Sequence, residues 1–180
     1  VNPSNFEQEL KDNKKQRKVL LTIDDGFLSF YENAWPILKK NKIPFILFVS
    51  TREVGAFNYM NWDQIREMSR AGVIIANHMV EHPYMLEIGS DETDADWINR
   101  LQNELLVAES RIEQETGQSH RYLAYPYGEF DLEKKLMLIN NGFIGLAQHS
   151  GAIGVNSDFL ALPLFPLASS YANLYTAKIK

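Results

Sequence analysis

Short apolar runs alternate along this chain with segments of helical periodicity, and this alternation constrains the fold more than any other feature. The apolar runs have the length of buried strands and cover Val19 to Ile23, Phe45 to Val49, Val73 to Ala76, Tyr122 to Tyr125 and Phe143 to Ala147. The helical segments between them cover Tyr31 to Lys40, Trp62 to Ala71, Asp91 to Thr116 and Leu132 to Asn140. Strands joined by crossover helices pair in parallel, so we expect an α/β fold with a mainly parallel sheet, open or closed into a barrel.

The composition fits a single globular domain. Of the 180 residues, 45% are hydrophobic and 23% are charged, and no repeat or Pro/Gly-rich linker divides the chain. We therefore expect one domain over 1–180, with a short helical extension at 1–17 in which Phe6 and Leu10 have helical spacing. The chain starts at Val1 without an initiator Met, which suggests that a segment such as a signal peptide has been removed.

Charge and hydropathy exclude several classes of partner. The chain has 18 Lys and Arg against 23 Asp and Glu, a net charge of -5, and its basic run is confined to residues 14–18. We therefore expect no nucleic-acid partner and no charge-driven membrane binding. No apolar stretch approaches the roughly 20 residues that span a bilayer, and the sequence carries no signal of an oligomeric state. Because cysteine is absent, any metal would be bound by histidines and carboxylates.

Two acids stand at the carboxyl end of the first expected strand, where chemistry gathers in parallel sheets. Asp24 and Asp25 follow this strand directly, and Gly26 comes next. Neighbouring residues in a regular strand point to opposite faces, so both acids reach one site only if the chain bends there. Gly26 allows this bend. The alternative interpretation is a solvated Asp-Gly turn, which is common in proteins.

Two of the four histidines, His78 and His82, follow the third expected strand. Imidazoles four residues apart can bind one metal ion if the backbone completes a turn between them, whereas the alternative is one capping and one surface histidine. The segment also fits the H-x-x-E-H pattern of inverted zinc peptidases, which requires a regular helix. A β-branched run precedes it and Pro83 biases His82 away from helical geometry, so we disfavour the peptidase.

An aromatic turn follows the fourth expected strand. Its residues Tyr125, Pro126, Tyr127 and Gly128 end the strand sharply and leave rings at its end. These rings could form the floor of a sugar-binding cleft, where the apolar faces of pyranose rings stack, and backbone N–H groups of the turn could stabilise an oxyanion. Phe27, which follows the acid pair, is a further candidate substrate contact. The alternative is a packed turn that binds no ligand.

Taken together, these motifs resemble the NodB-type polysaccharide deacetylases of carbohydrate esterase family 4. Residues 22–26 (TIDDG) resemble the family's T-F-D-D-G motif, residues 78–83 (HMVEHP) its H-[ST]-x-x-H-P motif, and residues 124–128 (AYPYG) a variant of its third motif. The resemblance covers about residues 17–167. It implies a distorted, incomplete (β/α) barrel.

The same resemblance implies roles for individual residues. Carried over by position, Asp24 would be the catalytic base. Asp25, His78 and His82 would bind a divalent metal, usually Zn²⁺, with Co²⁺ or Ni²⁺ as alternatives. An Asp and two His leave open positions for water and substrate, which is the arrangement of a catalytic zinc.

The chain departs from the family pattern in several places. Ala124 stands where the third motif often has an Arg that holds the base, and Leu164 stands where a subgroup has an Arg. The late D-x-x-D-W and L-x-H motifs, which supply the acid histidine, are not recognisable. His149 follows the fifth expected strand instead, as in a subgroup that includes poly-N-acetylglucosamine deacetylases. His149 is therefore the candidate general acid, and its alternative role is that of a hydrogen-bonding loop residue.

The expected function is metal-dependent hydrolysis of acetyl groups from N-acetylated sugar polymers or oligosaccharides of the N-acetylglucosamine type, outside the cytoplasm. Asp24 would take a proton from water, and the backbone N–H of Tyr127 would hold the oxyanion. Either His149 or protonated Asp24 would protonate the leaving amine. The alternatives are an acetylxylan-type O-deacetylase, a metal-binding pseudoenzyme that binds carbohydrate without turnover, and a non-haem iron oxygenase.

Overall fold

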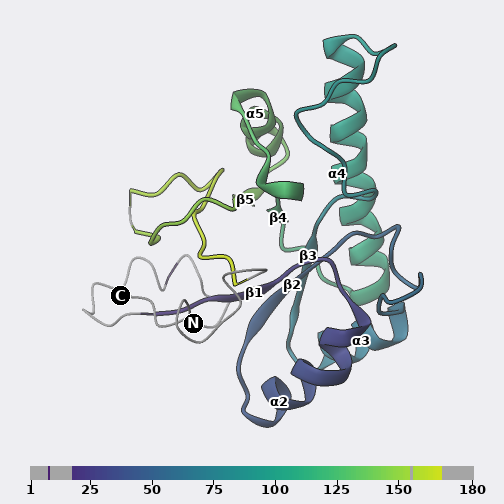
Figure 1. The fold of residues 1–180 in the computed structure, drawn as a ribbon, viewed down its shortest axis with the longest axis vertical. Coiled ribbons are helices and arrows are strands. Elements are labelled where there is room, and N and C mark those ends of the chain that lie inside the picture. The colour runs from purple at the N-terminus through teal and green to yellow at the C-terminus, as the bar shows by residue number, and fades with distance from the viewer. Residues whose placement is uncertain (1–7, 9–17, 155, 168–180) are drawn as a thin grey trace.

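The computed structural model describes residue 8 and residues 18–154 and 156–167. Its centre is a five-stranded parallel sheet with strands in chain order: β1 (Leu21–Ile23), β2 (Phe45–Val49), β3 (Ile74–Asn77), β4 (Tyr122–Ala124) and β5 (Ile144–Leu146). The sheet curls into an open half-barrel (Figure 1), which confirms the expected incomplete (β/α) barrel. Apart from residue 8, the helical extension expected at 1–17 lies outside the described residues.

Helical segments connect successive strands. They are a π-helical turn (Phe30–Ala34) that continues into α2 (Trp35–Lys40), then α3 (Trp62–Arg70), α4 (Asp94–Thr116), a 3-10 turn (Pro126–Gly128) and α5 (Leu132–Asn140). The start of α4 is later than the expected Asp91, because Thr93 caps the helix and exchanges hydrogen bonds with Asp96. In the described part of the chain, no helix combines the length and apolar character needed to cross a bilayer.

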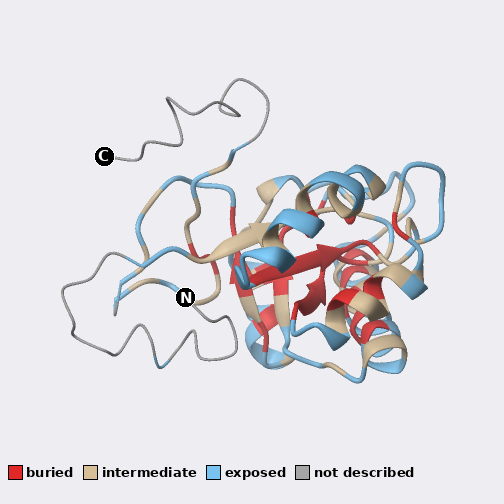
Figure 2. Ribbon diagram, turned by 90° about the horizontal axis from the view of Figure 1, so that it is seen from below, coloured by how far each residue is buried: buried red, intermediate tan, exposed pale blue. Residues whose placement is uncertain are grey.

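Both faces of the sheet are buried, which explains why its strands are continuous apolar runs. Along β2, Phe45, Leu47 and Val49 pack in the cluster that includes side chains of α2 and α3. Ile46 and Phe48 point the opposite way, into the cluster on the inner face of the half-barrel. Another cluster joins α4 and α5 to β4. The buried residues are concentrated in and directly around the strands (Figure 2).

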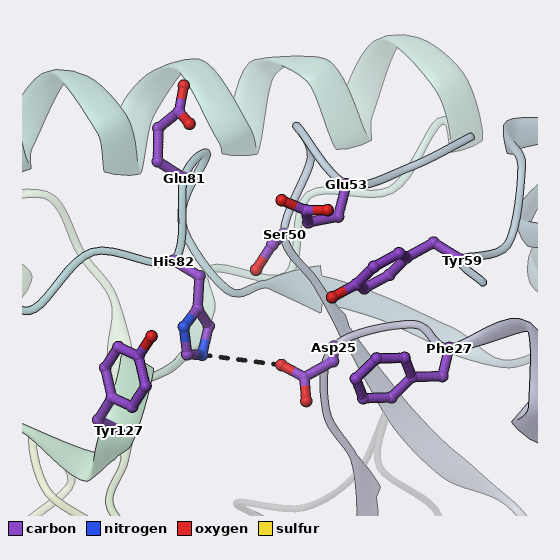
Figure 3. Close-up of a pocket in the computed structure, with 8 residues that line it drawn as sticks. All are labelled: Asp25, Phe27, Ser50, Glu53, Tyr59, Glu81, His82 and Tyr127. Atoms are coloured by element: carbon purple, nitrogen blue, oxygen red, sulfur yellow. Dashed lines mark ion pairs between the residues drawn. The ribbon is translucent and has the colours of Figure 1, made fainter. Parts of the chain in front are cut away.

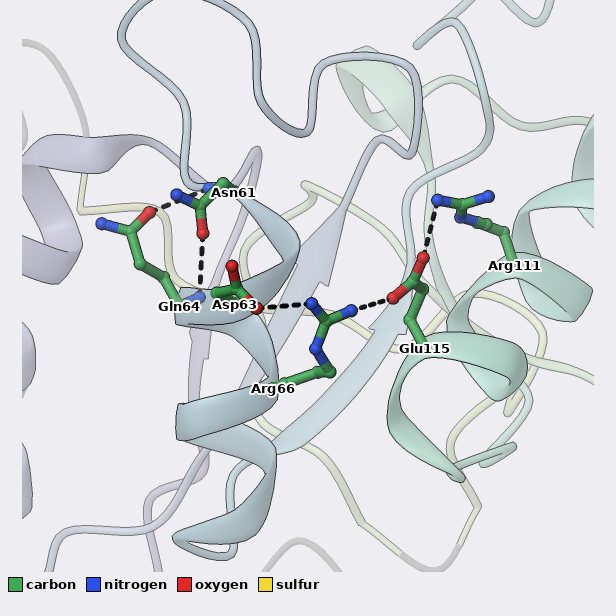
Figure 4. Close-up of polar contacts among 6 residues, drawn as sticks. All are labelled: Asn61, Asp63, Gln64, Arg66, Arg111 and Glu115. Atoms are coloured by element: carbon green, nitrogen blue, oxygen red, sulfur yellow. Dashed lines mark hydrogen bonds and ion pairs between the residues drawn. The ribbon is translucent and has the colours of Figure 1, made fainter.

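A charged network holds α3 beside α4 on the outside of the molecule (Figure 4). Arg66 of α3 donates to Glu115 of α4 and, at 2.6 Å, to Asp63 of its own helix. Glu115 also pairs with Arg111 at 2.6 Å. The C-terminal half of α4 is thereby fixed against the neighbouring helix.

The loops at the carboxyl edge of the sheet are hydrogen-bonded to one another. The N–H of Met60 donates to the carbonyl of Gly26 at 3.0 Å and joins the loops after β1 and β2. The N–H of Thr51 donates to the carbonyl of Met79 at 3.2 Å and joins the loops after β2 and β3. These bonds hold the loops that carry the candidate site in one arrangement.

Candidate active site

A carboxylate and two imidazoles converge at the carboxyl ends of β1 and β3. Asp25 Oδ1 lies 3.4 Å from Nε2 of the buried His78 and 3.7 Å from Nε2 of His82 (Figure 3 shows Asp25 and His82). One potential ligand atom from each residue lies within 4.8 Å of the other two. The structure therefore brings together the three residues that the sequence places in a metal site.

This group of atoms fits a divalent metal ion. Zinc binds imidazole nitrogen and carboxylate oxygen at about 2.0–2.1 Å, so tetrahedral ligand atoms lie about 3.3 Å apart. The separations of 3.4 and 3.7 Å from Asp25 Oδ1 to the two imidazoles are close to this value. Three protein ligands leave at least one position open, as in catalytic rather than structural zinc sites.

The turn after β1 presents both acids at the same edge of the sheet. The expected bend begins at Asp25, with φ 71°, and continues through Gly26, with φ 81°. The N–H of Gly26 donates to the carbonyl of Asp24 at 2.9 Å, which closes the turn. Aspartate is among the few non-glycine residues that adopt this left-handed conformation at low cost, so the sequence suits the turn.

The segment from His78 to His82 is not a helix. Met79 has φ 66° and His82 has φ 52°, and no helix covers these residues. The inverted zinc peptidase pattern needs a regular helix, so the structure rules out that alternative. The two imidazoles instead meet across an irregular loop.

The ring of His78 is oriented by a backbone carbonyl. Its Nδ1 lies 2.7 Å from the oxygen of Ala124. A carbonyl oxygen only accepts, so Nδ1 carries a hydrogen. Nε2 faces Asp25, to which it donates when the ring is protonated and presents a lone pair when the ring is neutral. Position 124, where the family pattern often has an Arg, therefore contributes to the site through its backbone.

The electrostatic environment shifts the pKa values of the neighbouring Asp24 and Asp25 in opposite directions. Burial raises the pKa of Asp24, the charge of His78 opposes this shift, and the charge of Asp25 adds to it. A hydrogen bond from His78 is the main cause that lowers the pKa of Asp25, against the opposing effect of burial. Asp25 is therefore suited to remain an anionic ligand, and Asp24 to accept a proton.

The two histidines also differ. Burial lowers the pKa of His82, and the charge of His78 lowers it further, which favours a neutral imidazole that can bind a metal. At His78, burial acts to lower the pKa, but the hydrogen bond with Asp25 and the charge of Asp24 outweigh it and raise the pKa. A cation bound between these groups would favour neutral His78.

A pocket of about 320 Å³ opens beside Asp25 and His82 (Figure 3). Stacked ring pairs stand at its edge. Tyr127, which lines the pocket, stacks on Tyr84 with ring centroids 4.1 Å apart and an interplanar angle of 4°. Phe27 and Tyr59, both lining the pocket, stack with centroids 4.9 Å apart. Aromatic rings that line a pocket can pack against pyranose rings.

Four residues that line this pocket were not identified from the sequence: Ser50, Glu53, Tyr59 and Glu81. Tyr84, which stacks on the lining Tyr127, was not identified either. For Tyr84, a signal was available, because it follows the His82-Pro83 pair directly. The residues 50–59 come from the loop after β2, which has no recognisable motif. Only the pairing of this loop with the loop after β1 brings them to the site.

The structure corrects part of the expected substrate-binding set. Tyr125 is 1% exposed and belongs to the core, with its hydroxyl donating to the carbonyl of Leu160 at 2.7 Å. Pro126 is also buried. The expectation that their rings form the floor of a cleft is therefore wrong. The alternation of β4 directs the side chain of Tyr125 into the core cluster shared with α4 and α5. Phe27 and Tyr127 do line the pocket.

His149 is not among the residues that line the pocket. It is exposed, and its ring centroid lies 5.9 Å from that of Phe130. Its carbonyl accepts a hydrogen bond from the N–H of Leu164 at 3.0 Å, so Leu164 packs beside the same loop. The acid role expected for His149 stays a prediction.

Fold and site together define a class of protein. The chain is an α/β half-barrel with a two-histidine, one-aspartate site, suited to a divalent metal, at the carboxyl edge of its parallel sheet. It belongs to the polysaccharide deacetylase family, whose model matches residues 11–143.

Individual relatives agree with this assignment. The chain is 28% identical over 158 residues to the poly-β-1,6-N-acetyl-D-glucosamine N-deacetylase of Staphylococcus aureus, covering 82% of this chain and 53% of that protein. The structure of IcaB from Ammonifex degensii matches with a TM-score of 0.74 at 27% identity, covering 91% of this chain and 74% of that one. The Streptococcus pyogenes deacetylase PplD in complex with acetate has the same fold, with a TM-score of 0.79 at 23% identity and coverage of 91% and 71%. The chain spans about half the length of the curated relatives it matches.

Proposed function

We propose that this chain is a metal-dependent hydrolase that removes acetyl groups from N-acetylated sugar polymers or oligosaccharides of the N-acetylglucosamine type. The observation that carries the proposal is the convergence of Asp25, His78 and His82 beside Asp24, at the edge of an aromatic pocket. Membership of the polysaccharide deacetylase family supports the reaction class. The match to a poly-β-1,6-N-acetyl-D-glucosamine N-deacetylase supports the substrate class.

Asp25, His78 and His82 would hold the metal, for which Zn²⁺ is the first choice and Co²⁺ or Ni²⁺ the alternatives. A divalent ion bound there supplies Lewis-acid polarisation of the acetyl carbonyl and brings the pKa of water down to about 7. The chain's own residues perform the proton transfers and position the sugar.

Asp24 accepts the proton of the water that attacks the acetyl carbon. Its raised pKa, caused mainly by burial, makes it a stronger base than an ordinary solvated aspartate. The backbone N–H of Tyr127 donates to the acetyl oxygen, where negative charge develops as the carbon becomes tetrahedral. Removing such a donor typically costs about 10²–10³ in kcat.

The amine must be protonated to leave. Asp24 already holds the proton taken from water and can return it to the nitrogen as the carbon–nitrogen bond breaks, which yields acetate and a free amine. Asp24 is the preferred donor because its charge interacts with His78 and Asp25 of the candidate metal site, and His149 is the alternative.

The aromatic pairs orient the sugar chain. We propose that pyranose rings pack against the exposed faces of Tyr127 with Tyr84 and of Phe27 with Tyr59, on either side of the acetyl group. Acetylated sugar polymers lie outside the cytoplasm, so the chain would act there.

Acetate release tests this function. Purified protein would be incubated with chitooligosaccharides, β-1,6-linked poly-N-acetylglucosamine, peptidoglycan and acetylxylan, with chelator or with added Zn²⁺ or Co²⁺. We expect metal-dependent acetate release from an N-acetylated substrate. His78→Ala should abolish it, while the matched control His120→Ala, an exposed histidine outside the pocket, should not.

Other outcomes identify the alternatives. Faster release from acetylxylan would indicate an O-deacetylase. Polymer and metal binding without acetate release would indicate a pseudoenzyme. Ala124 supports this alternative, because it stands where the family often has an Arg that holds the base. Stoichiometric iron with no acetate release would favour the oxygenase class, although Asp24 then has no evident task.

A further inference from the structure

The loop that carries the two candidate metal-binding histidines is intrinsically strained. Met79 and His82 have φ values of 66° and 52°, a left-handed region that residues with a side chain rarely adopt. Each such residue costs of the order of 1 kcal/mol and persists only where the surroundings over-determine the backbone. The contacts that hold this loop therefore decide whether His78 and His82 face Asp25.

One side of the loop is held through its carbonyl groups. The hydroxyl of Ser50 donates to the carbonyl of His78 at 3.0 Å. The N–H groups of Thr51 and Arg52 donate to the carbonyls of Met79 and Val80 at 3.2 and 3.1 Å. These donors all belong to the loop after β2.

The other side is held through its N–H groups by a single carboxylate of α4. Glu104 Oε2 accepts from the N–H of Val80 at 3.2 Å and from the N–H of Glu81 at 3.0 Å. These two residues lie between the histidines in the sequence. Because a carboxylate forms stronger hydrogen bonds than a neutral acceptor, Glu104 can fix two successive peptide groups at once.

The helix is itself anchored to the strand that precedes the loop. The side-chain amide of Asn77 donates to the carbonyl of Leu105 at 2.9 Å and to Glu109 Oε2 at 3.1 Å, and both acceptors belong to α4. Asn77 Oδ1 in turn accepts from the N–H of Met79 at 2.9 Å. The next turn of α4 is thus fixed to the end of β3, and this fixes the position of Glu104 relative to the loop.

We infer that Glu104 is a positioning residue: by bridging the N–H groups of Val80 and Glu81, it fixes the spacing of His78 and His82 and thereby sets the affinity of the metal site. Glu104 does not line the pocket and contributes no ligand atom. The inference rests on the metal site of the proposed function, and it adds a residue from a helix that no motif marks.

A variant series at position 104 tests this role. Glu104→Ala removes both hydrogen bonds, Glu104→Gln keeps an uncharged acceptor oxygen, and Glu104→Lys places a cation against the two N–H donors. Loss of a group that orients metal ligands typically weakens metal affinity by about 10–100-fold, which is the loss expected for Ala and Lys. Gln should restore most of the affinity.

Two matched controls separate positioning from general effects of charge and stability. Glu113→Ala removes an exposed carboxylate from the same helix. Arg52→Ala removes the exposed ion pair between Arg52 and Glu81, which joins the loop after β2 to the loop after β3. This substitution leaves the backbone hydrogen bonds between the two loops in place. Neither control should change zinc affinity more than about twofold, because exposed single charges contribute little.

The readouts are the zinc dissociation constant by chelator competition, the visible spectrum of the Co²⁺-loaded protein, and hydrogen exchange of the Val80 and Glu81 amides in metal-free protein. Melting temperatures of the metal-free variants are measured in parallel. We expect Glu104→Ala to exchange both amides faster and to bind zinc more weakly at a nearly unchanged melting temperature. A purely structural role would lower the melting temperature and leave zinc affinity unchanged.

The outcomes separate this inference from the proposed function. Unchanged zinc affinity in Glu104→Ala, in a protein that releases acetate, would overturn the inference and leave the function standing. Weaker zinc binding and faster amide exchange in Glu104→Ala, in a protein that releases no acetate, would support the inference and overturn the function.

Discussion

Tyr125 and Tyr127 lie two residues apart but have opposite environments, and substitutions should separate them cleanly. Tyr125 is 1% exposed, and its hydroxyl donates to the carbonyl of Leu160. Burial raises the pKa of Tyr125 well above its usual range, so this hydrogen bond is present at every working pH. Tyr127 is 47% exposed and lines the pocket. We expect stability to depend on the first residue and substrate affinity on the second.

The magnitudes follow from these contacts. Tyr125→Phe keeps the ring but leaves the partly buried carbonyl of Leu160 without its donor, which costs about 1–2 kcal/mol. For a chain of this length that lowers the melting temperature by roughly 2–8 °C. Tyr127→Ala removes the ring proposed to pack against the sugar, an interaction of about 0.5–1.5 kcal/mol, so KM should rise roughly 2–10-fold.

Thermal unfolding by circular dichroism and acetate-release kinetics on one N-acetylated oligosaccharide check both variants. Tyr125→Phe should melt earlier with KM within about twofold of the unmodified protein, because its hydroxyl does not reach the pocket. Tyr127→Ala should show the reverse pattern. A raised KM in Tyr125→Phe at an unchanged melting temperature would refute the assignment of Tyr125 to the core.

Three further predictions concern the metal site and the surface. Asp24→Asn should keep metal and lose turnover, because an amide cannot take the proton of water. Asp25→Asn should weaken metal affinity first. Metal content and acetate release are measured for both variants. Zinc at 100 times its dissociation constant should stabilise the fold by about 2.7 kcal/mol and raise the melting temperature by roughly 5–11 °C, an increase that His78→Ala should lose. A hydrogen bond from Arg100 lowers the pKa of Glu92 to about 2 from 4.5, so Glu92 stabilises the fold above pH 4.5 and this contribution is lost as the pH falls toward 2. The urea midpoint of Glu92→Gln should therefore lie below that of the unmodified protein at pH 7, by a margin that shrinks between pH 4.5 and pH 3.

The location of the candidate metal-binding residues could be predicted because it depends on topology alone. Asp25 follows β1 and His78 follows β3, and in a parallel sheet all such positions lie along one edge. No detail of side-chain packing enters this argument. The ordered set of motifs then singled out these residues from other acids and histidines.

The environment of Tyr125 was within reach of the sequence but was not predicted. Leu123 and Tyr125 belong to one core cluster, while Ala124 belongs to the cluster on the opposite face. This alternation continues one residue beyond the end of β4, because Tyr125 keeps an extended backbone with φ -67° and ψ 123°. Tyr127 has φ 55°, which breaks the alternation and turns its ring out of the core.

Glu104 could not be predicted in the same way. The buried stripe of α4 includes Leu101, Leu105 and Ala108, and a glutamate beside that stripe has the pattern of a solvated helix flank. Its partners are backbone N–H groups of an irregular loop, and backbone groups leave no mark in the sequence. Only the packing of α4 on β3 determines which side chain meets that loop.

Position 124 contributes its backbone carbonyl to the candidate site but, as an alanine, lacks the Arg side chain that often holds the base in the family pattern. Any residue there offers the carbonyl that orients His78, so Ala124 leaves the geometry of the candidate metal site intact. An alanine side chain cannot hold the base, and in the described part of the chain Asp24 forms no ion pair with a lysine or arginine. The proton affinity of Asp24 therefore depends on burial and on the charges of His78 and Asp25. The proposed metal binding and the proposed acetate release therefore rest on different groups, and a deacetylase and a pseudoenzyme would differ only in acetate release.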